Sequence, residues 1–134
     1  MRRTLHPLHV LLLAGTVPLF LGVLLTDIAY FNTYQVQWKN FASWLLVGAL
    51  VFCGLTALFA LIGMIRVDGR TRQVIVYLLL LLGAFVLGLI NAFVHASDAW
   101  ASMPLGLVLS VIVTAAVLAA TWLGLFHSRQ AETP

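Results

Sequence analysis

Four long runs of apolar residues take up most of this chain, and three of them contain no Asp, Glu, Lys or Arg. The runs cover residues 8–31, 41–65, 73–96 and 104–126, and the only charged residue inside them is Asp27. Each run is long enough to cross a bilayer as a helix. Because the membrane core offers no water to backbone groups, an apolar run of this length has to be helical. The sequence therefore predicts an all-α integral membrane protein with a single transmembrane domain of four helices.

Composition and length agree with this prediction. The chain has 134 residues, of which 63% are hydrophobic and 8% charged, whereas about a quarter of the residues of soluble domains are charged. Four spans with short connections use nearly all of the length, so neighbouring helices pack as an antiparallel bundle. We therefore expect no soluble catalytic domain within these residues. The net charge of +3 comes from residues in short connections and tails, so we expect a lipid bilayer and no nucleic acid as partner.

The basic residues predict the orientation of the bundle. Six arginines fall on one side of the predicted spans and only Lys39 falls on the other. Lysine and arginine collect in cytoplasmic loops, so we expect the amino and carboxyl termini in the cytoplasm and a multi-pass protein of the inner (plasma) membrane. The six arginines are Arg2, Arg3, Arg66, Arg70, Arg72 and Arg129.

Three histidines form the first candidate site, at the predicted inner rim. His6 and His9 lie three residues apart at the start of the first run, and His127 directly follows the fourth. Neighbouring neutral imidazoles can ligate a transition metal or the iron of a haem. The other interpretation is that they are interfacial anchors or helix-end caps. The sequence favours the second interpretation, because all three residues lie at helix ends rather than deep in the bundle.

The second candidate site is a polar cluster at the predicted outer rim. Asp27 and Tyr30 share a face of the first helix, and Asn91 and His95 share a face of the third. An acid inside a span is expensive unless it is paired or wetted, so Asn91 or His95 is the expected partner of Asp27. The functional interpretation is a proton- or ligand-handling site open to the outer side. The alternative, which we favour, is a hydrogen-bonded clasp that fixes how the first and third helices pack.

The remaining patterns argue against catalysis. The sequence contains no glycine-rich phosphate loop, no cysteine pair, no nucleophile elbow and no HExxH motif. Small residues repeat at four-residue spacing in the later spans and indicate helix seams, or secondly a face for self-association. The leading hypothesis is a non-enzymatic structural or accessory membrane protein that associates with itself or with a larger membrane complex. The alternatives are an electron-transfer protein that binds haem b or a metal, and a small transporter-like protein.

Several short strings resemble the bacterial membrane family called domain of unknown function 2231, over nearly the whole chain. The resemblance implies a small four-helix inner-membrane protein without a settled activity, suspected of binding haem through its histidines. The family pattern has a histidine early in the third helix, where this chain has Tyr77, so the resemblance leaves His6 or His9 with His127 as haem ligands. The most specific strings are His6-Pro7-Leu8-His9, Thr26-Asp27-Ile28-Ala29-Tyr30 and Thr121-Trp122-Leu123-Gly124.

Overall fold

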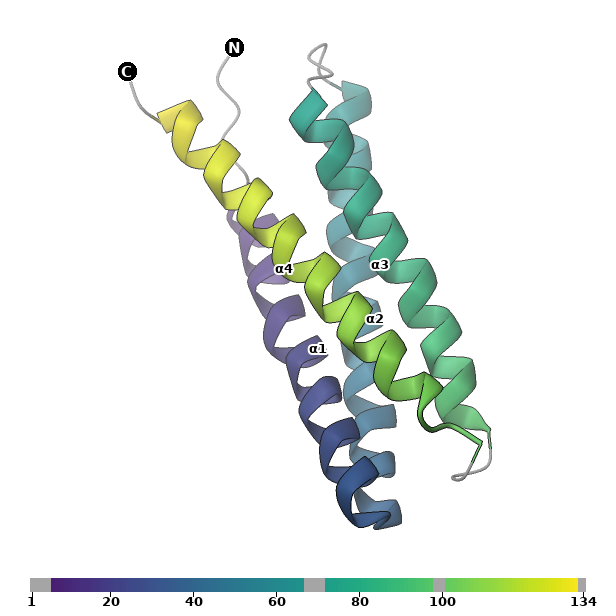
Figure 1. Cartoon of the computed structure of the whole chain (residues 1–134). Coiled ribbons are helices and arrows are strands. Elements are labelled where there is room, and N and C mark those ends of the chain that lie inside the picture. The colour runs from purple at the N-terminus through teal and green to yellow at the C-terminus, as the bar shows by residue number, and fades with distance from the viewer. Residues whose placement is uncertain (1–5, 67–71, 98–100, 133–134) are drawn as a thin grey trace.

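The computed structural model describes residues 6–66, 72–97 and 101–132, and this part of the chain folds into four long helices (Figure 1). All four are long and apolar enough to cross a membrane. The prediction of an all-α chain with four membrane-spanning helices is therefore confirmed. The helices are α1 (Pro7–Thr33), α2 (Val36–Arg66), α3 (Arg72–Ala96) and α4 (Leu105–Glu132).

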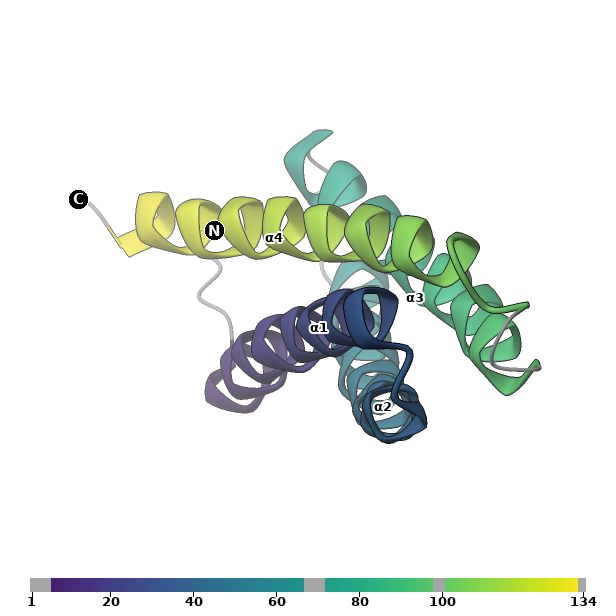
Figure 2. The same cartoon turned by 60° about the horizontal axis from the view of Figure 1, so that its bottom comes forward.

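The helices form a ring in chain order, and neighbours run antiparallel. Each helix contacts the one before it and the one after it, and α4 closes the ring against α1. Figures 1 and 2 show α1 and α3 on opposite sides of this ring, running in the same direction, so that they form one diagonal of the bundle. The start of α1 and the end of α4 lie at one end, here called the terminal end. The end of α1 and the end of α3 lie at the opposite end, here called the far end.

The turn between α1 and α2 is shorter than the sequence predicts. The polar stretch 32–40 is expected to be a connection, yet α1 continues to Thr33 and α2 begins at Val36. Tyr34 makes the reversal in the left-handed region, with φ 54° and ψ 24°, and its backbone N–H donates to the Tyr30 carbonyl oxygen at 2.6 Å. Gln37 and Lys39 are good helix formers, and the end of a long span reaches the polar headgroup layer. The polar residues therefore extend α2 instead of forming a loop.

Small residues line the inside of the bundle. Ala49, Cys53, Ala84 and Ala120 are fully buried, and all of them belong to the four-residue repeats in the sequence. Lipid gives helices no hydrophobic reason to associate, so close packing over small side chains supplies much of their attraction. The prediction that these repeats form internal seams is confirmed. α4 also continues past residue 126, the expected end of its span, to Glu132.

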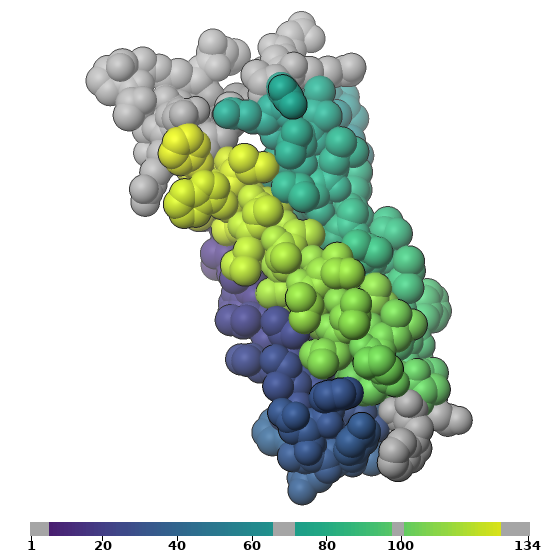
Figure 3. Space-filling view, viewed as in Figure 1, coloured from purple at the N-terminus to yellow at the C-terminus, as the bar shows by residue number. Residues whose placement is uncertain are grey.

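The outside of the bundle is apolar and carries large aromatic side chains. Trp44 is 78% exposed, Trp122 73% and Phe93 71%. In the space-filling view, α4 lies across the front of the molecule, with α1 visible on one side of it and α3 on the other (Figure 3). A continuous apolar surface of this kind would aggregate in water, whereas lipid tails solvate it. The bilayer is therefore the environment in which this bundle is stable.

The two halves of the molecule repeat one burial pattern. Eighteen residues separate His9 from Asp27 in α1 and Tyr77 from His95 in α3. Eighteen residues make five helical turns and span about 27 Å, so both members of each pair face the same side of their helix. Buried positions of α1 therefore recur 68 residues later in α3, directly across the diagonal. The recurring pairs are His9 and Tyr77, Leu13 and Leu81, Thr16 and Ala84, Phe20 and Gly88, Val23 and Asn91, and Asp27 and His95.

Candidate functional site

The candidate site is a buried polar cluster near the far end of the bundle. Asp27 of α1 and His95 of α3 meet across the diagonal, with Asp27 Oδ1 2.7 Å from His95 Nε2. Asp27 is 0% exposed and His95 3%. A carboxylate and an imidazole at this distance form a hydrogen-bonded ion pair or share a proton, which lowers the cost of placing an acid inside a span.

Ser110 of α4 bonds the other oxygen of the carboxylate. Its hydroxyl donates to Asp27 Oδ2 at 2.5 Å, and the Asn91 side-chain amide donates to Ser110 Oγ at 2.9 Å. Both residues are buried. The cluster therefore joins three helices in one chain of hydrogen bonds that runs from Asn91 through Ser110 and Asp27 to His95.

The same cluster contains one buried acceptor without a protein donor. The backbone carbonyl oxygen of Asn91 lies 2.9 Å from His95 Nδ1. The side-chain oxygen of Asn91, Oδ1, has no hydrogen-bond partner in the described part of the chain. Buried polar atoms in proteins nearly always have a partner, either a protein group or water. The network is thus complete around Asp27 and incomplete at Asn91.

Tyr30 and Lys39 lie beside this cluster. Tyr30 follows Asp27 by three residues on the buried side of α1, and its ring meets Tyr34 edge-on at 5.7 Å. Lys39 of α2 is nearly buried, and its ammonium donates to the Ser97 carbonyl oxygen at 2.5 Å, just beyond the end of α3. Lysine is a good partner for the last carbonyl groups of a helix, because the negative end of the helix dipole lies there. All four helices therefore contribute a polar group near the far end.

A second polar bridge crosses the same diagonal near the terminal end. The hydroxyl of Tyr77 lies 2.7 Å from Nε2 of His9, and the two rings stack with centroids 6.0 Å apart. His9 is 5% exposed and Tyr77 7%. By position along the sequence, His9 is expected beside His6 and His127, and Tyr77 stands where the family pattern has a histidine; in the structure Tyr77 is the direct partner of His9.

The three predicted rim histidines have different surroundings. His6 is exposed, and its Nδ1 accepts a hydrogen bond from the Leu8 backbone N–H at 3.2 Å, so it caps the start of α1. His9 points into the bundle toward Tyr77. The side chain of His127 lies outside the described residues. Within the described residues, no group of three His, Cys, Asp or Glu side chains could hold a metal ion.

Comparison with known proteins places the chain in a family. The family described as "Predicted membrane protein (DUF2231)" matches residues 5–129, nearly the whole length. The chain belongs to this family. No curated protein and no solved structure matches it. The family description agrees with the four spans of the structure and specifies no activity.

Haem binding, which the family resemblance implied, does not fit the arrangement around His9 in this DUF2231 member. Its Nε2 is at hydrogen-bonding distance from the Tyr77 hydroxyl, which leaves no space for an iron atom between these two side chains. The other ring in question, that of His6, is exposed and bonded to its own helix through Nδ1. The described side chains therefore do not bring two free imidazoles to one place.

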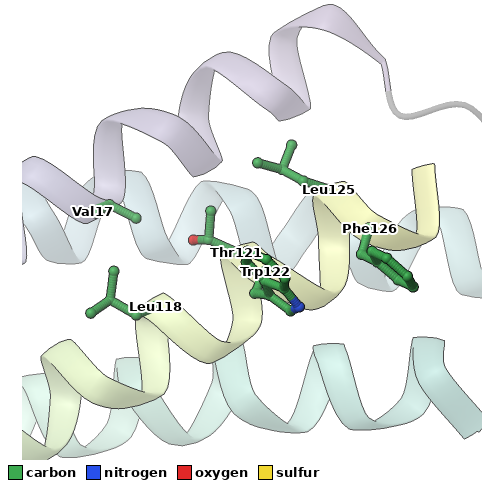
Figure 4. Close-up of a pocket in the computed structure, with 6 residues that line it drawn as sticks. All are labelled: Val17, Leu118, Thr121, Trp122, Leu125 and Phe126. Carbon is green, nitrogen blue, oxygen red and sulfur yellow. The ribbon is translucent and has the colours of Figure 1, made fainter. Parts of the chain in front are cut away.

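Apart from the two bridges, the described residues form a groove between α1 and α4. Its volume is about 270 Å³, and Figure 4 shows Val17 facing the α4 side chains across it. Trp122 and Phe126 stack with centroids 6.5 Å apart. The hydroxyl of Thr121 is bonded to the Val117 carbonyl oxygen at 2.8 Å, so the groove presents an apolar wall suited to hydrocarbon. The lining residues are Val17, Leu118, Thr121, Trp122, Leu125 and Phe126.

Three parts of the site were not predicted from the sequence: Ser110, Lys39 and the pairing of Tyr77 with His9. Ser110 belongs to the small residues that repeat at four-residue spacing in the fourth span, a pattern that indicates packing. Its residue type and position could have indicated a bond to Asp27, because it carries a hydroxyl on the buried face of α4 at the depth of Asp27. The depth of Tyr77 could have indicated its pairing with His9, since it lies five residues after the start of α3, close to the level of His9 in α1.

Proposed function

We propose that this protein is a non-enzymatic structural or accessory component of the inner membrane, which associates with itself or with a larger membrane complex. The observation that carries the proposal is the closure of the Asp27 cluster. Both carboxylate oxygens are bonded to side chains of other helices, and the cluster is buried. An acid that is satisfied by its neighbours in this way acts as a clasp between helices.

The orientation that we propose places the terminal end in the cytoplasm. The support is the bias of six arginines against one lysine between the two sides of the membrane. Arg2, Arg3 and Arg70 lie outside the described residues, so this support comes from the sequence. At the far end, the ammonium of Lys39 is bonded to a carbonyl group at the end of α3.

Association is tested by purifying the protein in a mild detergent from cells that make two differently tagged copies. We expect the second tag, or a reproducible set of larger membrane proteins, to follow the first through purification. Mixing two separately expressed preparations after lysis is the control, because copies that first meet in detergent indicate adventitious association. A single copy that purifies without companions contradicts the accessory role.

The absorption spectrum separates this proposal from the haem alternative. We expect the purified protein to lack a Soret band, because the ring nitrogen of His9 that faces the bundle is already bonded to Tyr77. The measurement is an absorption spectrum of protein made in cells supplied with a haem precursor. A Soret band that disappears in His9→Ala or His127→Ala, and persists in Trp44→Ala, would replace the structural proposal with a haem protein.

A further inference from the structure

The hydrogen bonds of His95 determine where its ring protons lie. Nδ1 is 2.9 Å from the backbone carbonyl oxygen of Asn91, and a carbonyl oxygen can only accept, so Nδ1 carries a hydrogen. A neutral imidazole has a single N–H, and here that hydrogen is used at Nδ1. Nε2, however, is 2.7 Å from Asp27 Oδ1. A hydrogen bond at this position therefore requires a second proton, located between Nε2 and Oδ1.

This second proton makes the pair electrically neutral. If it resides on Nε2, an imidazolium faces a carboxylate. If it resides on Oδ1, a carboxylic acid donates to a neutral imidazole. Without it, the lone pair of Nε2 would point at a carboxylate, and a net negative charge would remain in a buried site. Both consequences are strongly unfavourable in an apolar interior.

We propose that Asp27 and His95 form a proton-binding site whose occupancy controls the contact between α1 and α3. The bound proton forms the Oδ1 to Nε2 hydrogen bond and holds the far end of the diagonal closed. Release of the proton removes this hydrogen bond and leaves two acceptors facing each other, so the two side chains separate.

The other charged and titratable groups around the pair agree with such a site. Tyr30 lies one turn from Asp27 on α1, and α4 contributes the hydroxyl of Ser110. The cation is Lys39 of α2, which bonds to the Ser97 carbonyl oxygen two residues beyond His95. When the proton leaves, Lys39 partly balances the negative charge that remains on Asp27.

Exchange of the proton takes place with the far end of the bundle. The interior between the two polar bridges is largely filled by apolar side chains such as Leu13, Phe20 and Leu81. The buried hydroxyls in this interior, those of Thr16, Thr56 and Thr114, each donate to a carbonyl oxygen of their own helix and so form no chain toward the terminal end. On the far side, Ser97 is exposed and lies two residues beyond His95. The unpartnered Oδ1 of Asn91 is an acceptor at which an entering water molecule joins the network.

The proposal is tested by nitrogen NMR of histidine-labelled protein in lipid nanodiscs, together with infrared spectra. The signals of His95 are assigned by their loss in His95→Gln. We expect Nδ1 of His95 to carry a hydrogen at neutral pH, and the second proton to be found either as an imidazolium or as a carboxylic-acid band that is absent in Asp27→Asn. A neutral His95 with its hydrogen on Nε2, and no such acid band, would overturn the proposal.

Proton counting gives a second, independent readout. On a shift from acid to alkaline pH, we expect the native protein to release one proton per chain more than Asp27→Asn, because an amide at residue 27 supplies its own N–H to Nε2. This variant keeps every hydrogen bond of the cluster, so we expect its fold to be the same as that of the native protein. His95→Gln should show the same loss. Equal proton release from the native protein and both variants would rule out exchange at this site.

Discussion

Replacement of Asp27 by alanine is expected to lower the free energy of unfolding by about 3 kcal/mol, whereas replacement by asparagine changes it by less than about 1 kcal/mol. Alanine leaves Nε2 of His95 and the hydroxyl of Ser110 without their partner, and both groups are buried. Asparagine has the same shape, so that its amide N–H donates to His95 and its carbonyl oxygen accepts from Ser110. The difference in unfolding free energy between the two variants measures the contribution of the hydrogen bonds separately from that of the charge.

The measurement is reversible unfolding in mixed micelles, followed by circular dichroism and tryptophan fluorescence. Both variants have to be compared with the native protein at the same micelle composition, since detergent changes the reference state. A matched control is Thr26→Ala, one residue away, because the Thr26 hydroxyl bonds only to carbonyl groups of its own helix in the hydrogen bonds observed here. If Asp27→Ala unfolds like this control, Asp27 is not a clasp.

The fold could be predicted because the membrane restricts what an apolar run can form. Each of the four runs had to become a helix, and short connections had to make neighbours antiparallel. The boundaries were harder to predict, since a helix that leaves the membrane can continue in polar residues. For this reason α2 starts at Val36 and α4 ends at Glu132 instead of at the edges of the apolar runs.

The site was partly predictable, because depth in the membrane can be counted from the helix ends. Asp27, Asn91 and His95 were grouped by depth, and the structure brings all three into one network. The histidine set was grouped by position along the sequence instead, and the structure shows His9 with Tyr77. Rotation of each helix about its axis decides such contacts, and a uniformly apolar span gives little indication of rotation.

The repeat across the diagonal was not visible in the sequence, because most of its paired residues are chemically unlike. Phe20 of α1 and Gly88 of α3 form one of the recurring pairs, and a Cβ atom at Gly88 would lie 3.5 Å from the Phe20 ring. At this pair a large residue on one helix packs against a small residue on the other, as close packing requires. Burial repeats while residue type does not, so that only the three-dimensional arrangement reveals the pattern.

Replacement of Gly124 by alanine is expected to lower the free energy of unfolding by about 2 kcal/mol, although alanine is the better helix former. A Cβ atom at this position would lie 2.8 Å from Cε2 of Tyr77 and 3.2 Å from Cδ2 of Leu13. The Tyr77 ring cannot move aside freely, because its hydroxyl is bonded to His9 and the rings are stacked. The added methyl group therefore pushes α4 away from α3 or breaks the bridge at the terminal end.

Gly83→Ala is the matched control for this prediction, with the opposite expected sign. A Cβ atom at Gly83 would have nothing within 4 Å, so alanine there adds only helix propensity and should stabilise the protein by up to about 1 kcal/mol. Both variants are measured by the same micelle unfolding. Combining Gly124→Ala with Tyr77→Phe tests the cause, because a ring without the hydrogen bond can turn and should recover part of the loss. Equal destabilisation by Gly124→Ala and Gly83→Ala would mean that backbone effects, and not the tethered ring, set the cost.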